Sequence, residues 1–182
     1  FSAITLWENI TVGTTFFKIT SDRLPASFNG FKIAQISDLH NAELGQDHSE
    51  IIRILKEEKP QIIVITGDLI DSNHLDIDTA ISFVQQAVNI APCYYVTGNH
   101  EAWIKEDYQK LEDRLLDSNV IILHDEVVIF ERDSESIQLI GLDDPEFSDQ
   151  DSYIQQIVLS TKLSNLNLDN RFRLLLSHRP EA

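Results

Sequence analysis

The chain has 182 residues, of which 42% are hydrophobic and 24% are charged, a composition typical of a globular protein with a sizeable core. Its 14 Lys and Arg against 30 Asp and Glu give a formal net charge of −16. Such a negative field repels a polyanion, which argues against nucleic-acid wrapping by a basic surface. A phosphate-bearing small substrate would then need a local cation, such as a metal ion, in its site.

Neither a linker nor a membrane span is visible in the sequence. No Gly, Ser or Pro-rich stretch divides the chain, so we expect a single domain over residues 1–182. The longest apolar run, residues 62–65, is far shorter than the ~18 residues that a spanning helix needs. The one cysteine, Cys93, excludes an internal disulfide, and we expect it to be a small buried residue of a strand.

Predicted strands and helices alternate along the chain. Residues 4–20 are rich in Thr, Val, Ile and Phe, which indicates one or two strands with a hairpin around Gly13. Asp47 and Glu50 form a capping box ahead of the first helix, which stops at Pro60. Further strands are expected over residues 31–37, 61–66, 93–97, 120–123, 127–131, 137–142 and 172–176, and further helices over 77–88, 104–115 and 153–163. This order predicts an α/β fold with a partly antiparallel insertion.

Polar side chains follow the predicted parallel strands. Asp38 and Asp68 are 30 positions apart and Asp68 and Asn99 are 31 apart, and each spacing is close to the ~30 residues of one β-α-β step. The carboxyl ends of parallel strands meet at one edge of the sheet, where ligands of open α/β folds bind. We therefore expect six side chains to converge there: Asp38, His40, Asp68, Asn99, His100 and His178.

The chemistry of this set points to metal binding. It offers oxygen and imidazole ligands without a thiolate, which suits Mn²⁺, Fe or Zn²⁺. A shared carboxylate could bridge two ions about 3.5 to 4 Å apart, which would neutralise a phosphoryl group and lower the pKa of a bound water. The metals would also supply the positive field that the chain lacks.

Four blocks, each after a predicted strand, resemble the calcineurin-like metallophosphoesterase superfamily: Asp38-Leu39-His40, Gly67-Asp68, Gly98-Asn99-His100-Glu101 and Leu176-Ser177-His178. The resemblance runs from Phe31 to the last residue. Residues 31–40, 66–71 and 141–145 are most similar to a bacterial branch of small, often membrane-associated phosphohydrolases. The resemblance implies a four-layer α/β sandwich, in which two face-to-face β-sheets are flanked by helices, with its C-terminal part missing from this chain.

The resemblance also implies a centre of two divalent ions, with Mn²⁺ as the first choice and Fe or Zn²⁺ as alternatives. The implied ligands are one carboxylate shared by both ions and two further residues for each ion: Asp68 bridges, Asp38 and His40 bind the first ion, and Asn99 and His178 bind the second.

The activity that the resemblance implies is hydrolysis of a phosphoester by in-line attack of a metal-bound hydroxide. In that pattern His100 binds no metal and reaches the scissile phosphate, as the acid for the leaving oxygen or as a transition-state donor. The expected substrate is a phosphodiester, a phosphomonoester or a lipid-linked pyrophosphate. The branch resemblance favours the first and the last, with a lipid or the cell envelope as the source.

One block of the family pattern is absent. A closing Gly-His-x-His block supplies one histidine to each ion, and the chain reaches Ala182 without it. We expect the parent protein to continue past Ala182, and this chain to bind ions loosely and hydrolyse generic esters little or not at all. Since the chain starts at Phe1 and has no Met, we also expect a removed N-terminal segment that associates the full-length protein with a membrane or the cell envelope, this chain itself being soluble.

Two other functions compete with this interpretation. A noncatalytic binding or scaffold domain could keep the fold without the chemistry, and the absent closing block favours it, whereas the intact ligand set opposes it. A nucleotide-binding α/β module ranks last, because no Gly-x-Gly-x-x-Gly or Walker-type loop follows any predicted strand.

Several further residues have two interpretations each. We expect Arg179 to be a solvated arginine rather than a phosphate ligand, and Trp103 and Tyr108 to pack helices rather than contact substrate. Asp143-Asp144-Pro145 is equally compatible with a plain turn and with a supporting element of the site. Three histidines that match no block are expected at the surface: His48, His74 and His124.

Overall fold

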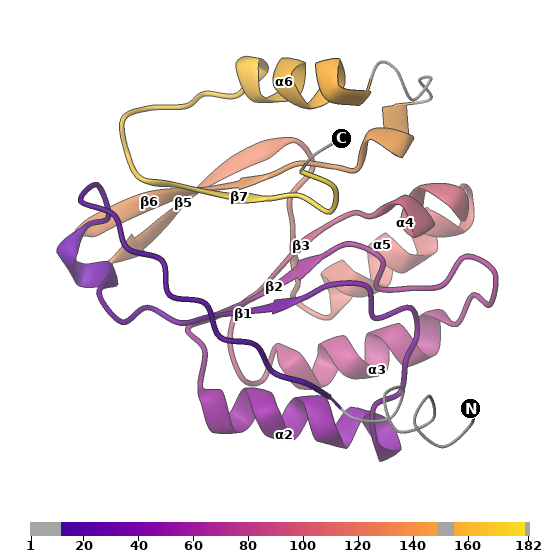
Figure 1. Cartoon of the computed structure of the whole chain (residues 1–182). Coiled ribbons are helices and arrows are strands. Elements are labelled where there is room, and N and C mark those ends of the chain that lie inside the picture. Colours follow the sequence, from indigo (N-terminus) through magenta and orange to yellow (C-terminus); the bar gives the residue numbers. More distant parts are fainter. Residues whose placement is uncertain (1–11, 149–154, 181–182) are drawn as a thin grey trace, which may run out of the picture.

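Two β-sheets lie face to face between layers of helices (Figure 1). The computed structural model describes residues 12–148 and 155–180. The first sheet is parallel in the order β1-β2-β3-β4, with β1 (Ile33–Ile36), β2 (Ile62–Thr66), β3 (Cys93–Val96) and β4 (Ile121–Ile122). The second sheet has the order β5-β6-β7, with β5 (Glu126–Arg132), β6 (Glu135–Gly141) and β7 (Arg173–Leu176). β5 and β6 pair antiparallel, and β6 and β7 pair parallel.

Helices connect the parallel strands and cover the outer faces of both sheets. They are α2 (Ser49–Glu58), α3 (Ile77–Ala87), α4 (Asn99–Trp103), α5 (Asp107–Asp117) and α6 (Gln155–Asn165). Figure 1 shows α2 and α3 on the side of the first sheet that faces away from the second sheet, and α6 beyond the second sheet.

Three apolar clusters fill the spaces between these layers. The largest joins α2, α3 and α5 to the first sheet and includes Ile63, Phe83 and Leu115. The second lies between the two sheets and includes Val64 and Leu139. The third joins the second sheet to α6. The predicted α/β sandwich of two face-to-face sheets flanked by helices is therefore confirmed.

The central strand β2 shows how a continuous apolar run fits this architecture. All five of its residues are buried. Because successive side chains of a strand point to opposite faces, Ile63 and Ile65 join the helix-side cluster while Ile62 and Val64 join the cluster between the sheets. A parallel strand covered on both faces needs no polar alternation.

The helix predicted over 104–115 is confirmed from Asp107 onward as α5, but a separate short helix that was not predicted, α4, precedes it, so the helical segment after β3 is divided in two. α4 ends at Trp103 and α5 begins at Asp107. Between them Lys105 has φ 50°, a left-handed backbone through which an α-helix does not continue. The division matters because α4 starts shortly after β3 and carries the polar block Asn99-His100-Glu101 in its first turn.

Two other local expectations are wrong. The Asp47 carboxylate accepts a hydrogen bond from Ser82 Oγ of α3 at 2.7 Å instead of capping α2, which begins at Ser49. Residues 12–20 contain no strand, so the predicted hairpin is not formed there, and residues 1–11 lie outside the described ranges. A strand-like composition forms a strand only where a partner can pair with it.

The expectation for Cys93 is confirmed, because its side chain is fully buried on β3. Among the residues that the structure describes, no helix is both long and apolar enough to cross a bilayer.

Candidate metal centre

The loops that follow β1 and β2 carry three of the predicted ligands in a left-handed backbone. Asp38, His40 and Asp68 have φ values of 55°, 47° and 51°. The two loops are joined by hydrogen bonds from Asp38 N to Gly67 O (3.2 Å) and from His40 N to Asp68 O (3.0 Å). Non-glycine residues held in this region cost about 1 to 3 kcal/mol each, and they concentrate at functional sites.

Two glycines let the ligand-bearing loops approach one another. A Cβ atom added to Gly98 would lie 2.2 Å from Asp68 Oδ1. One added to Gly67, whose φ is +83°, would lie 2.7 Å from Gly98 Cα and from the His178 ring. Any larger residue at either position would push the ends of β2, β3 and β7 apart.

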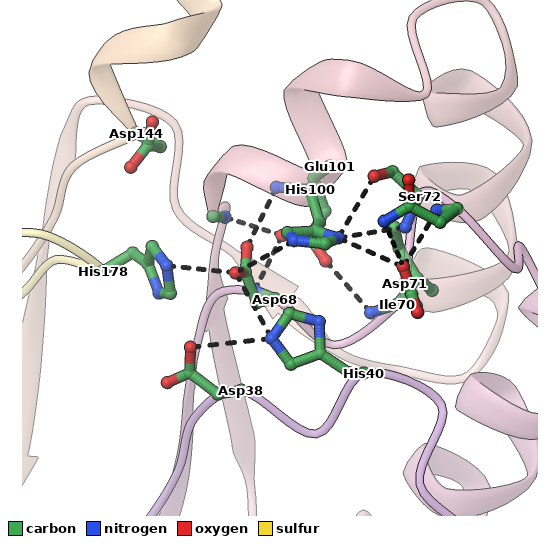
Figure 2. A network of polar contacts seen from close by, with 12 residues as sticks. Asp38, His40, Asp68, Ile70, Asp71, Ser72, His100, Glu101, Asp144 and His178 are labelled. Carbon is green, nitrogen blue, oxygen red and sulfur yellow. Dashed lines mark hydrogen bonds and ion pairs between the residues drawn. The ribbon is translucent and has the colours of Figure 1, made fainter.

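The Asp68 carboxylate lies at the middle of the site (Figure 2) and is almost fully buried. Its Oδ1 atom accepts a hydrogen bond from the His100 backbone N–H at 2.9 Å. Three imidazole Nε2 atoms surround its Oδ2 atom, at 3.3 Å (His178), 3.6 Å (His40) and 4.0 Å (His100). Burial raises the pKa of Asp68, but the hydrogen bonds from His178 and His100 outweigh burial, so the pKa is lowered and the carboxylate is charged at neutral pH.

Among the residues that the structure describes, two groups of side chains have the geometry to hold metal ions, and both contain Asp68. In each group the candidate ligand atoms lie within 4.8 Å of one another, and the groups are His40, Asp68 and His100, and Asp38, Asp68 and His178. The structure thus brings together five of the six residues that the sequence analysis singled out. The sixth, Asn99, is the partly buried first residue of α4, directly before His100.

The hydrogen bonds of His178 prepare it as a ligand. Its Nδ1 atom donates to the Thr66 carbonyl at 2.8 Å, which leaves Nε2 facing Asp68. Burial lowers the pKa of His178, but Asp68 and the Thr66 carbonyl outweigh burial and raise the pKa to about 9. A metal ion at this position would replace the Nε2 proton, with the ring already oriented by the carbonyl.

His100 has the opposite arrangement of ring protons. The Ser72 backbone N–H points at His100 Nδ1 at 3.0 Å, and because an N–H can only donate, Nδ1 must accept. This pattern assigns the ring proton of neutral His100 to Nε2, which faces Asp68. Asp71 Oδ1 lies 3.5 Å from the same Nδ1 atom. A protonated Nε2 suits a hydrogen-bond donor better than a metal ligand.

Glu101 supports the site, and the sequence analysis gave it no role. Its side chain is fully buried and accepts backbone hydrogen bonds from Gly98, Asp68, Leu69 and Ile70 at 2.7, 2.8, 2.8 and 3.3 Å. One carboxylate therefore ties the loop after β2 to the start of α4. An acidic residue in the first turn of a helix was the available signal, because such residues often accept the free N–H groups there.

Replacing Glu101 with glutamine should destabilise the fold by about 3 kcal/mol or more, because the new amide N–H₂ would face backbone N–H donors. Thermal or urea unfolding of the chain measures this change. Glu57→Gln is the matched control, because the Glu57 side chain is 61% exposed and pairs with Arg53 on the same helix. Equal stability of the two variants would show that the Glu101 hydrogen bonds are not needed.

The three remaining histidines do not all behave as expected. His74 is a surface residue, with a side chain that is 89% exposed. His48 is buried, and its Nε2 atom bonds to the Thr79 carbonyl at 3.0 Å, so the expectation of a surface position is wrong. His124 is partly exposed and lies between two carboxylates, Glu112 at 2.7 Å and Asp143 at 2.9 Å.

The sequence of the chain is similar to those of metallophosphoesterases. The chain is 29% identical over 168 residues to the uncharacterized metallophosphoesterase YkoQ of Bacillus subtilis. The aligned region is 87% of this chain and 56% of YkoQ. It is 31% identical over 176 residues to a bovine (Bos taurus) transmembrane protein with a metallophosphoesterase domain. That alignment includes 92% of this chain and 39% of the bovine protein. The chain thus spans only about half, or less, of the length of these relatives.

A solved structure and a family profile complete the comparison. The structure of TT1561 of Thermus thermophilus matches with a TM-score of 0.50 at 12% sequence identity. The matched region is 79% of this chain and 66% of the TT1561 chain. At this low identity the likeness supports the fold alone. The profile described as calcineurin-like phosphoesterase matches residues 31–182, which include every candidate ligand. The chain therefore belongs to the calcineurin-like phosphoesterase family.

Proposed function

We propose that this protein is a dinuclear metal-dependent phosphoester hydrolase. The observation that carries the proposal is the position of Asp68, whose charged carboxylate belongs to both candidate ligand groups. Asp38, His40, Asp68 and His178 would hold the ions together with Asn99, and the oxygen and imidazole donors suit Mn²⁺ first, and also Fe or Zn²⁺. When bound, the ions supply positive charge to the phosphoryl oxygens and lower the pKa of a water molecule.

His100 has a separate role in this proposal. Its Nε2–H faces the centre, while the Ser72 N–H at Nδ1 fixes the plane of the ring. The ring can therefore present a proton to the leaving oxygen of the ester, or donate a hydrogen bond to the phosphoryl group in the transition state.

For the substrate we propose a phosphodiester or a lipid-linked pyrophosphate. The family branch motivates this choice, and one relative is named as a transmembrane protein, which supports a membrane-associated whole protein. Trp103 adds a local argument. Trp103 is 50% exposed and its ring centroid lies 4.8 Å from that of His100, so part of its surface is free to contact a substrate. An apolar group on the leaving oxygen would find a contact surface there.

A metal titration tests the proposal. Purified chain without chelator, titrated with Mn²⁺ in a calorimeter and checked by elemental analysis, should bind up to two ions per chain. Bis(4-nitrophenyl) phosphate then serves as a generic diester for hydrolysis. A chain that takes up no Mn²⁺, Fe²⁺ or Zn²⁺ would contradict the hydrolase proposal and favour a noncatalytic binding domain of the same fold.

A further inference from the structure

The turn that follows β6 is buried and charged, although its sequence, Asp143-Asp144-Pro145, is that of an ordinary surface turn. Asp144 is fully buried, and its carboxylate accepts the Glu146 backbone N–H at 2.9 Å. A carboxylate with no exposure requires a partner, because an unpaired buried charge costs several kcal/mol. Two partners connect this turn to strands that carry proposed metal ligands.

The first connection is to the end of β3. The Asp144 backbone N–H donates to Thr97 Oγ1 at 3.0 Å, and the Thr97 hydroxyl donates to Asp143 Oδ1 at 2.9 Å. Thr97 is fully buried and directly precedes Gly98, which begins the block containing Asn99 and His100. The turn therefore fixes the backbone from which α4 starts.

The second connection is to the residue after His178. Arg179 Nε donates to Asp144 Oδ2 at 2.8 Å, and Arg179 Nη2 donates to the other carboxylate oxygen. This two-bond pairing fixes the orientation of the guanidinium group as well as its position. The expectation of a solvated arginine is therefore wrong. The edge of Arg179 that carries Nε and Nη2 is occupied by Asp144, so it is not available to a substrate phosphate.

We propose that Asp144 is a positioning residue, whose carboxylate sets the place of His178 through Arg179, while its backbone N–H holds Thr97 ahead of α4. The inference rests on the proposed function in one respect only, the role of His178 as a metal ligand. Figure 2 shows Asp144 and His178 on the same side of Asp68, without direct contact between Asp144 and the centre. Asp144 thus acts through its neighbours.

The packing of His178 shows why its position depends on Arg179. Its ring lies against Gly67, with no room for even a methyl group between them, and Nδ1 is held by the Thr66 carbonyl. These contacts limit the ring from the β2 side. Arg179, paired with the buried turn after β6, limits the backbone from the other side. Loss of that pairing would let His178 Nε2 move away from Asp68 Oδ2, now 3.3 Å distant.

The neighbouring Asp143 has a different task. Its carboxylate pairs with His124, which Glu112 contacts from the opposite side. The hydrogen bond that the Asp143 carboxylate accepts from His124 outweighs burial and raises the pKa of His124 to about 9, so the ring is charged at neutral pH. This pairing ties the turn to α5, away from His178. Glu112→Gln therefore weakens an ion pair of His124, the partner of Asp143, without touching Arg179, and it is the matched control.

The first measurement needs no metal. In metal-free chain labelled with ¹⁵N-histidine, the Nδ1–H proton of His178, protected by the Thr66 carbonyl, should give a resolved signal. We expect Asp144→Asn to broaden or remove this signal through exchange with water, and Glu112→Gln to leave it unchanged at the same temperature. Arg179→Lys, which keeps the charge but loses the two-bond geometry, should have an intermediate effect and covers the case in which Asp144→Asn does not fold.

The second measurement is Mn²⁺ affinity. Asp144→Asn should weaken binding about 10- to 100-fold, the usual loss when a partner of a ligand is removed, while Glu112→Gln stays within about two-fold of the unsubstituted chain. The double variant Asp144→Asn/Arg179→Gln also removes the positive charge of Arg179, which has lost its pairing with Asp144 in the single variant. It should regain thermal stability without regaining affinity.

The outcomes separate the two proposals. An unchanged His178 signal in Asp144→Asn, or a double variant with full Mn²⁺ affinity, would overturn the positioning role and leave Asp144 and Arg179 as an ion pair that only stabilises the fold. If the unsubstituted chain binds no metal but loses the His178 signal in Asp144→Asn, the proposed function fails while the positioning of His178 stands.

Discussion

Replacing Asp68 with asparagine is expected to remove both ions from the protein. The carboxylate belongs to both candidate ligand groups, and its Oδ2 atom faces three imidazole Nε2 atoms. The amide keeps the size of the side chain but loses the charge, and it can place an N–H₂ group toward the ions. We expect Mn²⁺ affinity to fall by about 100-fold or more, beyond the loss that removal of an outer partner causes.

The comparison with Asp38→Asn makes this prediction specific. Asp38 belongs to only one of the two groups and is exposed, so its replacement should lower the stoichiometry by one ion and leave the other bound. Elemental analysis after equilibration with Mn²⁺ measures both variants in the same way. If Asp68→Asn retains both ions, or if the two variants lose the same number, the bridging role of Asp68 is wrong.

Local patterns were sufficient to predict the sheets and the approach of the ligands. β2 is predictable because the four consecutive apolar residues 62–65, between Pro60 and Gly67, fit a strand that is buried on both faces. The convergence of residues as distant as Asp38 and His178 follows from the rule that parallel strands end at one edge. In each case one simple constraint, burial or topology, determines the outcome.

The supporting contacts could not be predicted in the same way. Glu101 and Asp144 are buried acids with partners 31 to 35 positions away in the chain, which are the backbone of residues 68–70 for Glu101 and the guanidinium of Arg179 for Asp144. Their sequence surroundings suit solvated helix starts and turns equally well. The strand prediction for residues 12–20 was wrong for a related reason, because strand propensity does not identify a pairing partner. In each case the local sequence does not identify the residue or strand that serves as the partner.

His100 provides the test of proton transfer. His100→Ala should leave the metal content unchanged and lower kcat by about 10²- to 10⁴-fold, the usual contribution of a residue that transfers a proton. The measurement belongs in the longest form of the protein that hydrolyses the diester. His74→Ala is the control, because the His74 side chain is 89% exposed and His74 lies in no candidate ligand group.

The leaving group separates an acid from a merely structural histidine. An ester of 4-nitrophenol releases a stable anion and needs little help from an acid, whereas an alkyl ester needs a proton on its leaving oxygen. His100→Ala should therefore slow the alkyl ester far more than the 4-nitrophenyl ester, while a structural defect would slow both alike. Equal losses would assign His100 to transition-state binding or to support of the fold. Loss of an ion in this variant would instead make His100 a ligand in the group that it forms with His40 and Asp68.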